Sequence, residues 1–471
     1  MKKIISVLLC VFMAFAVLCV SACNSGGGST DTGELVKDEN GNVVYDDVII
    51  RLTTVVTGED KETLQNLVSK FNREYKDKIT VTMNGIPEAT FEKDVSTQLT
   101  NNNNPPDFIM SHQEGLKSLA DLKLIKPLDK IMSDSGINFD MNDYASALSQ
   151  YAYLGTNNLY AVPSDAQSVM VLYNKDVLTA CGYNELPENH DELVQLCTSV
   201  KNQGYTPIAW STSFQQFQSY VFVTALLQNG AELYNQNSYK AEWVSNAQNK
   251  IAFENALASI RDLTNTSPAD DTTANILNKF LNNQALFYVA APWNMSSVLT
   301  AYIEKNKSLG IETVDELAEH IGGTSMANWF ALDNTAEYAN VIYGDAHFFA
   351  MTKAVTDVTK QAAILEFIRW FTQNSSISAT WGETGHISLY SATVVSDEYN
   401  KNSYVKNYVT KFYPEINNFR CTGSTPYFSD LRTYLGQIII TALNKTNTLS
   451  DEAIMTYNQN KYNEQVDFSN M

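Results

Sequence analysis

The chain has 471 residues, of which 44% are hydrophobic, and it carries a net charge of −20 at pH 7. This length exceeds what one ordinary hydrophobic core holds, so we expect two lobes or domains. The acidic balance makes nucleic acids and anionic lipid headgroups poor partners, which excludes a nucleic-acid-binding function.

The N-terminus is predicted to be a secretion signal. Lys2 and Lys3 supply positive charge, and residues 4–20 are apolar but fewer than the about 20 residues that a membrane-spanning helix needs. Val20-Ser21-Ala22-Cys23 places two small residues before a cysteine and resembles the lipobox of bacterial lipoproteins. The resemblance implies that residues 1–22 are removed and that Cys23 is acylated, which would anchor the protein on the extracytoplasmic face of the cell membrane. Ordinary secretion, with Cys23 lost or idle, is the alternative.

Residues 23–45 are predicted to be a flexible tether, because residues 24–33 are rich in Gly, Ser and Thr. No later apolar stretch approaches the length of a membrane span, so the lipid is the expected membrane contact.

Three cysteines, Cys181, Cys197 and Cys421, remain in the folded part. An odd number argues against a disulfide framework. Cys181 and Cys197 could pair in an oxidising compartment, but Cys197 lies in a helical apolar pattern. We therefore favour buried, small hydrophobic roles for these thiols.

The first folded unit is predicted to alternate strands and helices. The expected strands are residues 48–55, 79–83 and 107–110, and the expected helices follow the stripe Leu64, Leu67, Val68, Phe71 and the segment 91–99, with a capping box at Thr57 and Asp60. A βαβαβ order implies a parallel sheet whose ligands lie beyond the carboxyl ends of the strands. The loops after Val55, Met83 and Met110 are therefore the expected functional edge.

A second α/β unit follows. Its expected strands are 168–173, 207–210 and 284–290, and its expected helices are 191–200, 217–227 and 275–281. Helical spacing returns at 362–371, and 452–462 is predicted to be a polar closing helix.

Several motifs in a fixed order point to a known family. They are Asn104-Pro105-Pro106-Asp107-Phe108-Ile109, residues 119–128, Leu159-Tyr160-Ala161-Val162-Pro163, and Val171-Leu172-Tyr173-Asn174-Lys175-Asp176. Together they resemble the extracytoplasmic solute-binding proteins of carbohydrate ABC transporters, the group that contains maltose-binding protein. The resemblance covers nearly all of the chain after Asp46.

The resemblance implies an α/β fold of two lobes, each a mostly parallel sheet flanked by helices, that close over a sugar in the cleft between them. The chain crossings are expected near 163–167, 348–352 and 389–396. The expected N-terminal lobe is 46–165 plus about 350–390, and the expected C-terminal lobe is about 166–349 plus about 391–471.

Sugar recognition needs aromatic faces for the C–H side of the ring and polar groups for its hydroxyls. Trp293, after a proline at a strand end, matches the family's stacking tryptophan, and Trp381 is the second expected platform, in a loop near the third crossing. Trp243 and Trp370 are expected in the core. The other candidate ligand-binding residues, each weighed against an ordinary surface or core role, are His112, Glu114, Asp165, Gln167, Trp210, Phe214, Glu383 and His386.

Catalysis is disfavoured, because the chain contains no Gly-x-Ser-x-Gly, His-Glu-x-x-His, Cys-x-x-Cys or phosphate-loop motif. A glycosidase pair is not excluded by counting carboxylates. Five histidines scattered along the chain show no metal-ligand spacing, so we expect neither a metal nor a cofactor.

The sequence therefore predicts a monomeric, lipid-anchored subunit of an ABC importer that binds a mono- or oligosaccharide and passes it to permease subunits. Two alternatives stay open: the same fold binding a glycerol-phosphate compound or ferric iron, and a cell-surface carbohydrate-active enzyme.

Overall fold

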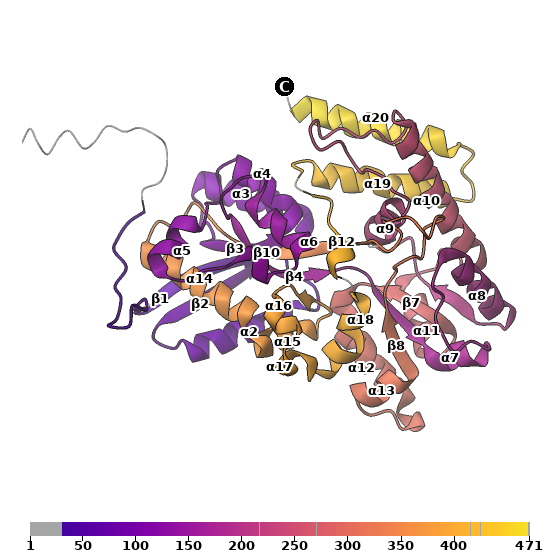
Figure 1. The fold of residues 1–471 in the computed structure, drawn as a ribbon, viewed down its shortest axis with the longest axis horizontal. Coiled ribbons are helices and arrows are strands. Elements are labelled where there is room, and N and C mark those ends of the chain that lie inside the picture. The colour runs from indigo at the N-terminus through magenta and orange to yellow at the C-terminus, as the bar shows by residue number, and fades with distance from the viewer. Residues whose placement is uncertain (1–30, 216, 270, 415, 424, 470–471) are drawn as a thin grey trace, which may run out of the picture.

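The computed structural model describes residues 31–469 apart from residues 216, 270, 415 and 424, and its two lobes lie side by side (Figure 1). The predicted signal peptide and Cys23 lie outside the described residues. Within them, no helix is long and apolar enough to cross a membrane.

The described end of the predicted tether contacts the folded part of the chain. Thr32 exchanges backbone hydrogen bonds with Thr356 and Val358. The Asp31 carboxylate accepts hydrogen bonds from the Lys126 ammonium group at 2.9 Å and from the Gln361 amide at 2.7 Å.

The N-terminal lobe is built on a six-stranded sheet with the order β11-β4-β10-β3-β1-β2. Its strands are β1 (Val48–Thr54), β2 (Ile79–Gly85), β3 (Phe108–His112), β4 (Ala161–Gln167), β10 (Asp345–Met351) and β11 (Ile387–Ser388). Strands β1, β2 and β3 pair in parallel as predicted, but β10 pairs antiparallel with both β3 and β4. The sheet is therefore mixed rather than mostly parallel, because β10 enters it on returning from the other lobe.

Helices cover both faces of this sheet (Figure 1). The helices of this lobe are α2 (Lys61–Glu74), η1 (Glu88–Thr90), α3 (Phe91–Asn101), α4 (Gln113–Asp121), α5 (Asp129–Ser135), η2 (Met141–Asp143), α6 (Ser146–Ser149), η3 (Gln150–Tyr153), α14 (Val358–Gln373), α15 (Ser375–Gly382), α16 (Ser391–Val394) and α17 (Asp397–Asn400). The apolar stripe predicted for α2 is buried, and its Phe71 ring packs edge-on against Phe367 and Trp370 of α14. The predicted capping box is wrong: Asp60 precedes α2 without a side-chain capping bond.

The C-terminal lobe has a four-stranded sheet with the order β6-β7-β5-β8. Its strands are β5 (Met170–Asn174), β6 (Thr206–Ala209), β7 (Ala285–Ala290) and β8 (Ile321–Thr324). Only β6 and β7 pair in parallel, so this sheet is mixed as well.

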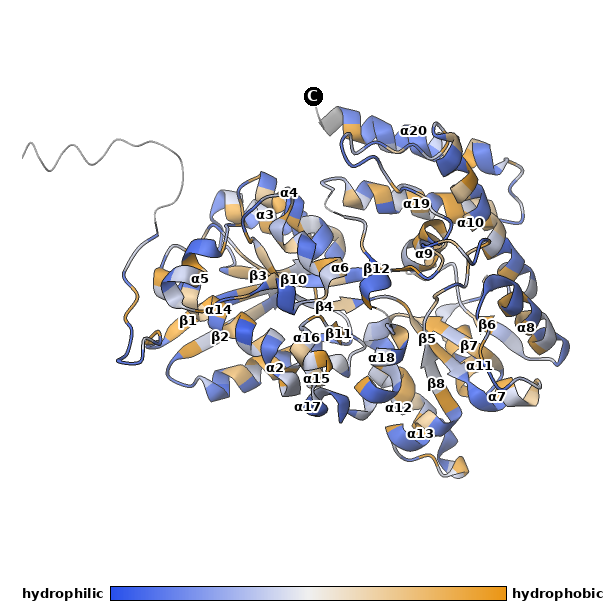
Figure 2. Cartoon of the chain, in the orientation of Figure 1, coloured by the Kyte–Doolittle hydropathy of each residue, from blue (hydrophilic) through white to orange (hydrophobic). Residues whose placement is uncertain are grey.

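The predicted helices of this lobe are present, and 217–227 forms a π-helical turn that continues into an α-helix. The set is α7 (Lys175–Ala180), α8 (His190–Asn202), η4 (Phe217–Val221), α9 (Phe222–Leu227), α10 (Ala247–Thr266), α11 (Thr273–Leu281), η5 (Pro292–Asn294), α12 (Met295–Asn306), η6 (Lys307–Leu309), α13 (Val314–His320), η7 (Val405–Val409), α18 (Thr410–Phe412), η8 (Ile416–Asn418), α19 (Phe428–Leu443) and α20 (Asp451–Ser469). The outer helix α20 is mostly hydrophilic, whereas the strands are mostly apolar (Figure 2). Cys181, Cys197 and Cys421 are free and buried.

Within the described residues, the chain passes between the two larger sheets at three places. The first follows β4. The second is at Gly344, between β9 (Ile342–Tyr343) and β10. The third lies between α17, which packs on α15, and η7, which packs on β8. The predicted crossings and lobe boundaries stay predictions.

Gly344 is required by close packing at the second crossing. A Cβ atom at this position would lie 2.1 Å from the Gln167 carbonyl oxygen and 2.4 Å from the ring of Phe419, which belongs to β12 (Phe419–Arg420). Strand β12 pairs with β9, so two crossings and a later segment meet at this glycine.

The contact between α2 and α14 should carry a large share of the stability of the N-terminal lobe. Replacing the fully buried Phe71 with Ala should lower the free energy of unfolding by about 3–5 kcal/mol. The exposed aromatic Tyr457 on α20 is the matched control. Tyr457→Ala should change the free energy of unfolding by less than about 0.5 kcal/mol. Urea unfolding of both variants measures this, and equal losses would contradict the assignment.

Candidate functional site: a polar cleft between the lobes

The three loops that follow β1, β2 and β3 contact the C-terminal lobe. Ser297 of α12 donates a hydrogen bond to the Glu59 carboxylate at 2.5 Å, and Arg432 of α19 pairs with Glu88. The Gln113 amide donates to the Gly423 carbonyl oxygen at 3.4 Å. The edge predicted from the strand order is therefore a surface where the lobes meet, and its function stays a prediction.

Polar side chains form a row across three adjacent strands at this edge. His347 of β10 is in register with His112 of β3 on one side and with Asp165 of β4 on the other. Asp345 is in register with Gln167. Because residues that face each other across a ladder share a face of the sheet, these side chains lie together on one face of it.

Asp165 and His347 form a buried ion pair, with the His347 Nδ1 atom 2.8 Å from the Asp165 Oδ1 atom. Burial opposes both charges, but the Asp165 carboxylate raises the pKa of His347, and His347 lowers the pKa of Asp165. Trp381 donates a hydrogen bond from Nε1 to the second oxygen of Asp165 at 2.9 Å. The Asp165 carboxylate is therefore fixed in place from two sides.

Glu114 and Asp345 share one proton. Burial, together with the negative charge of Asp345, raises the pKa of Glu114 well above its usual value. Asp345 stays ionised, because the His112 ring, 3.3 Å away, and the hydroxyl of Tyr220 lower its pKa against the effect of burial. The site therefore holds one carboxylic acid beside one carboxylate.

Two amide oxygens in this region, Gln113 Oε1 and Gln167 Oε1, have no hydrogen-bond partner although they are buried. A buried acceptor without a donor costs about 1–3 kcal/mol, so such a group indicates a place where a bound molecule supplies donors. These two amide oxygens thus lack hydrogen-bond donors.

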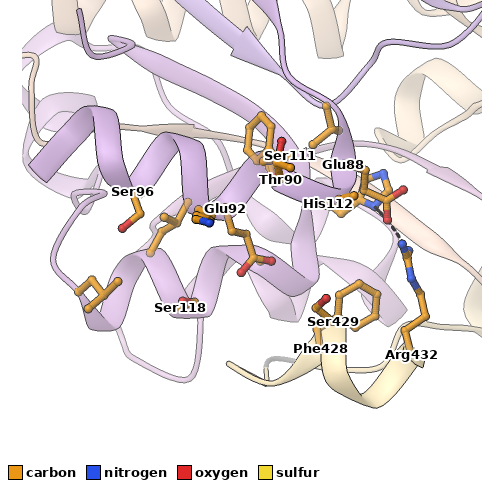
Figure 3. A pocket seen from close by; sticks show the side chains of 17 residues that line it. Glu88, Thr90, Glu92, Ser96, Ser111, His112, Ser118, Phe428, Ser429 and Arg432 are labelled. Carbon is orange, nitrogen blue, oxygen red and sulfur yellow. Dashed lines mark hydrogen bonds and ion pairs between the residues drawn. The ribbon is translucent and has the colours of Figure 1, made fainter. Parts of the chain in front are cut away.

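A cavity of about 370 Å³ opens beside this row, between α3 and α4 of one lobe and α19 of the other (Figure 3). Its walls include Glu88, His112, Phe428 and Arg432, and the Arg432 guanidinium lies 5.5 Å from the Phe428 ring centroid. The volume lies in the usual range for small-molecule sites.

The predicted aromatic platforms differ in exposure. Trp293 is half-buried in η5 and packs near Gly58 of the opposite lobe, since a Cβ atom on Gly58 would lie 3.2 Å from the Trp293 ring. Trp381 lies in α15 rather than in a loop, and its buried ring stacks on His386 at a centroid distance of 4.6 Å. Trp210 is buried against Phe217 and donates a hydrogen bond to the Ser267 carbonyl oxygen, so it belongs to the core.

Two other predicted residues lie away from the polar row. Phe214 is half-buried in the loop after β6. Glu383 accepts a hydrogen bond from the Asn402 amide at 2.6 Å, and its carbonyl oxygen accepts one from Ser296 of the C-terminal lobe, so it joins the lobes. Trp243 and Trp370 are buried as predicted.

The structure adds site residues that the sequence did not single out, namely Asp60, Asp345, His347, Tyr220 and Arg432. One signal was available for two of them. Asp345 and His347 are polar residues two apart in an otherwise apolar strand, which places both on one face. The other three come from elements that only folding brings together.

Comparison with known proteins agrees with this architecture. Residues 57–376 match the family described as bacterial extracellular solute-binding protein. The chain belongs to this family. The chain is 25% identical to the sn-glycerol-3-phosphate-binding periplasmic protein UgpB of Escherichia coli (strain K12) over 151 residues. These residues are 31% of this chain and 34% of that protein. The match thus spans about a third of the length of these curated relatives.

Solved structures of the same fold superpose on nearly the whole of this chain. The sugar-binding protein MalE from Xanthomonas citri superposes with a TM-score of 0.68 at 16% identity, over 90% of this chain and 98% of that one. The cyclic alpha-maltosyl-1,6-maltose binding protein from Arthrobacter globiformis gives 0.66 at 15% identity, over 89% and 99%. At this identity the likeness shows the two-lobed, periplasmic-binding-protein-like fold.

The Asp60 carboxyl should make stability depend on pH. Burial raises its pKa to about 6, so its contribution is most favourable below about pH 4 and is lost as the pH rises through 6. In buffer without ligand or metal, Asp60→Asn should therefore raise the free energy of unfolding by up to about 3 kcal/mol at pH 7.5 and by little at pH 4. Urea unfolding at both values measures this, and a gain that does not change with pH would contradict it.

Proposed function

We propose that this family member is the extracytoplasmic, lipid-anchored binding subunit of an ABC importer and that it holds a mono- or oligosaccharide between its lobes as a monomer. The observation that carries the proposal is the pair of buried amide oxygens without donors, Gln113 Oε1 and Gln167 Oε1, near the surface where the lobes meet. Sugar hydroxyls are hydrogen-bond donors, so a bound sugar would satisfy these oxygens.

The same observation argues against an anion such as a glycerol phosphate. A phosphate accepts hydrogen bonds and needs cationic or N–H donors around it. The Arg432 guanidinium lies in the cavity wall and already forms an ion pair with Glu88. Burial opposes its charge and the Glu88 carboxylate raises its pKa, so the charge of Arg432 is already neutralised by Glu88. The partial likeness to UgpB keeps glycerol 3-phosphate as the ligand to test against sugars.

Binding rather than turnover is also supported by the carboxyl groups. A glycosidase places its two carboxyl groups at least about 5 Å apart, on either side of the bond that breaks. Glu114 and Asp345 instead interact directly. We therefore propose a binding protein and not a carbohydrate-active enzyme.

The proposal is tested with purified mature protein by thermal shift, followed by calorimetry, against a panel of mono- and oligosaccharides and glycerol 3-phosphate. A sugar that binds the folded state raises its melting temperature. A response to glycerol 3-phosphate alone, or hydrolysis of a glycan, would replace the proposal with one of its alternatives.

Trp293 should act as the sugar-stacking surface. Its half-buried ring lies at the end of β7 in η5, against the loop that follows β1 in the other lobe. Trp293→Ala should weaken the affinity for the best sugar by on the order of 2 kcal/mol, measured by calorimetry, because truncating a central aromatic contact removes this much binding energy.

Trp210→Ala is the matched control for Trp293→Ala. Because Trp210 is buried in the core, this variant should lose about 3–5 kcal/mol of folding stability. Unchanged sugar affinity in Trp293→Ala, together with a stability loss as large as that of Trp210→Ala, would assign Trp293 to the core instead.

Lipid attachment is proposed at Cys23, and Cys23→Ser should move the protein from the membrane fraction to the soluble fraction. Its sugar affinity should not change, because the cleft is formed by residues after Asp46. Membrane fractionation with immunodetection measures this. A Cys23→Ser protein that stays in the membrane fraction would contradict the proposal.

A further inference from the structure

Tyr413 contacts groups from both lobes through one hydroxyl. The residue is buried and directly follows α18 in the C-terminal lobe. Its hydroxyl accepts a hydrogen bond from the Ser168 backbone N–H at 2.8 Å and donates one to the Gly385 carbonyl oxygen at 3.4 Å. A tyrosine hydroxyl has one proton to donate and lone pairs that accept, so this one group makes both bonds.

Ser168 extends these hydrogen bonds to the second crossing. The residue follows β4, where the chain makes its first crossing, and its hydroxyl donates to the Tyr343 carbonyl oxygen at 2.5 Å. Tyr343 ends β9 and precedes Gly344, the residue of the second crossing. A continuous chain of buried hydrogen bonds therefore links the first two crossings to Tyr413.

The bond from Tyr413 to Gly385 passes from one lobe to the other. Gly385 lies between α15 and β11, and β11 pairs with β4 in the sheet of the N-terminal lobe. Opening of such a fold turns the lobes about the crossings. Ser168 lies at a crossing, so its bond to Tyr413 is kept during opening, whereas Gly385 moves with the other lobe and its bond to Tyr413 is lost.

The C-terminal lobe contacts the segment 382–386 at a second place. The Ser296 hydroxyl of α12 donates to the Glu383 carbonyl oxygen at 2.5 Å. A Cβ atom on Gly385, whose φ is +89°, would lie 2.4 Å from the Pro292 carbonyl oxygen. The backbone conformation and this close approach both require glycine, so the segment is shaped to fit the C-terminal lobe when the lobes are together.

The residues around this segment also reach the polar row. Trp381 donates a hydrogen bond to Asp165, and its ring stacks on His386. The Thr384 hydroxyl lies 2.7 Å from the His386 Nδ1 atom. Contacts from the C-terminal lobe and contacts to the Asp165 carboxylate therefore meet within the six residues 381–386.

We propose that Tyr413 is a positioning residue that favours the closed arrangement of the lobes, with Ser296 as the second C-terminal contact of the segment 382–386. The inference rests on the proposed function, a protein that binds its ligand between two lobes. Because these contacts join protein groups to each other, they raise the closed population before a ligand binds. A larger closed population strengthens the apparent affinity in proportion.

The test measures the distance between the lobes in the mature Cys23→Ser protein. Spin labels are placed at the exposed positions Thr100 of α3 and Tyr457 of α20, each replaced with Cys. Helices α3 and α19 line opposite sides of the cavity, and α20 packs on α19, so this distance reports opening. Pulsed electron spin resonance gives the populations of closed and open protein without any ligand.

Tyr413→Phe should lower the ratio of closed to open protein by about three- to tenfold, as expected for the loss of one hydrogen bond. Ser296→Ala should lower the ratio in the same direction. The affinity for the best sugar should weaken by the same factor as the ratio. Since the distance measurement needs no ligand, it decides the proposal even where the protein binds no sugar.

Tyr399→Phe is the matched control. Tyr399 is also buried, and its hydroxyl also accepts a hydrogen bond from a backbone N–H, that of Ser388 at 3.1 Å, but both residues belong to the N-terminal lobe. This variant should lose stability without any change in the ratio of closed to open protein.

Three results would overturn the proposal: a wild-type protein with no closed population, an unchanged ratio in folded Tyr413→Phe, or an equal change in Tyr399→Phe. If Tyr413→Phe does not fold, Ser296→Ala decides, and an unchanged ratio in that variant would likewise overturn the proposal.

Discussion

The insertion of β10 between β3 and β4 is the constraint on which the cleft depends. This strand returns from the C-terminal lobe at Gly344 and enters the first sheet antiparallel to both neighbours. The entry places His347 beside Asp165 and His112, and Asp345 beside Gln167. One crossing thus both joins the lobes and supplies the central charges of the site.

The charges in the cleft are balanced in a specific way. His347 neutralises Asp165, Arg432 neutralises Glu88, and Glu114 keeps a proton beside the ionised Asp345. What remains are the Gln113 and Gln167 amide oxygens, which have no donors. This pattern is the basis on which we propose a ligand that donates hydrogen bonds.

Asp60 does not form the helix cap that its local sequence predicts. Its spacing from Thr57 is typical of a capping box, which would place both side chains at the start of α2. Instead, Asp60 turns into the cleft toward His386, and α2 begins without a side-chain cap. Departures of this kind are expected where residues serve binding rather than helix stability.

The sequence by itself determined the alternation of strands and helices, the apolar faces of α2 and α14, and the loops at the edge where the lobes meet, because these follow from hydrophobic periodicity and strand order. It also placed Trp293 at a strand end. Only the tertiary structure decided that Trp210 and Trp381 are buried, and that His112, His347 and His386 lie within one site although they are far apart in the chain. Register between strands from distant segments sets those contacts, and no spacing along the sequence encodes it.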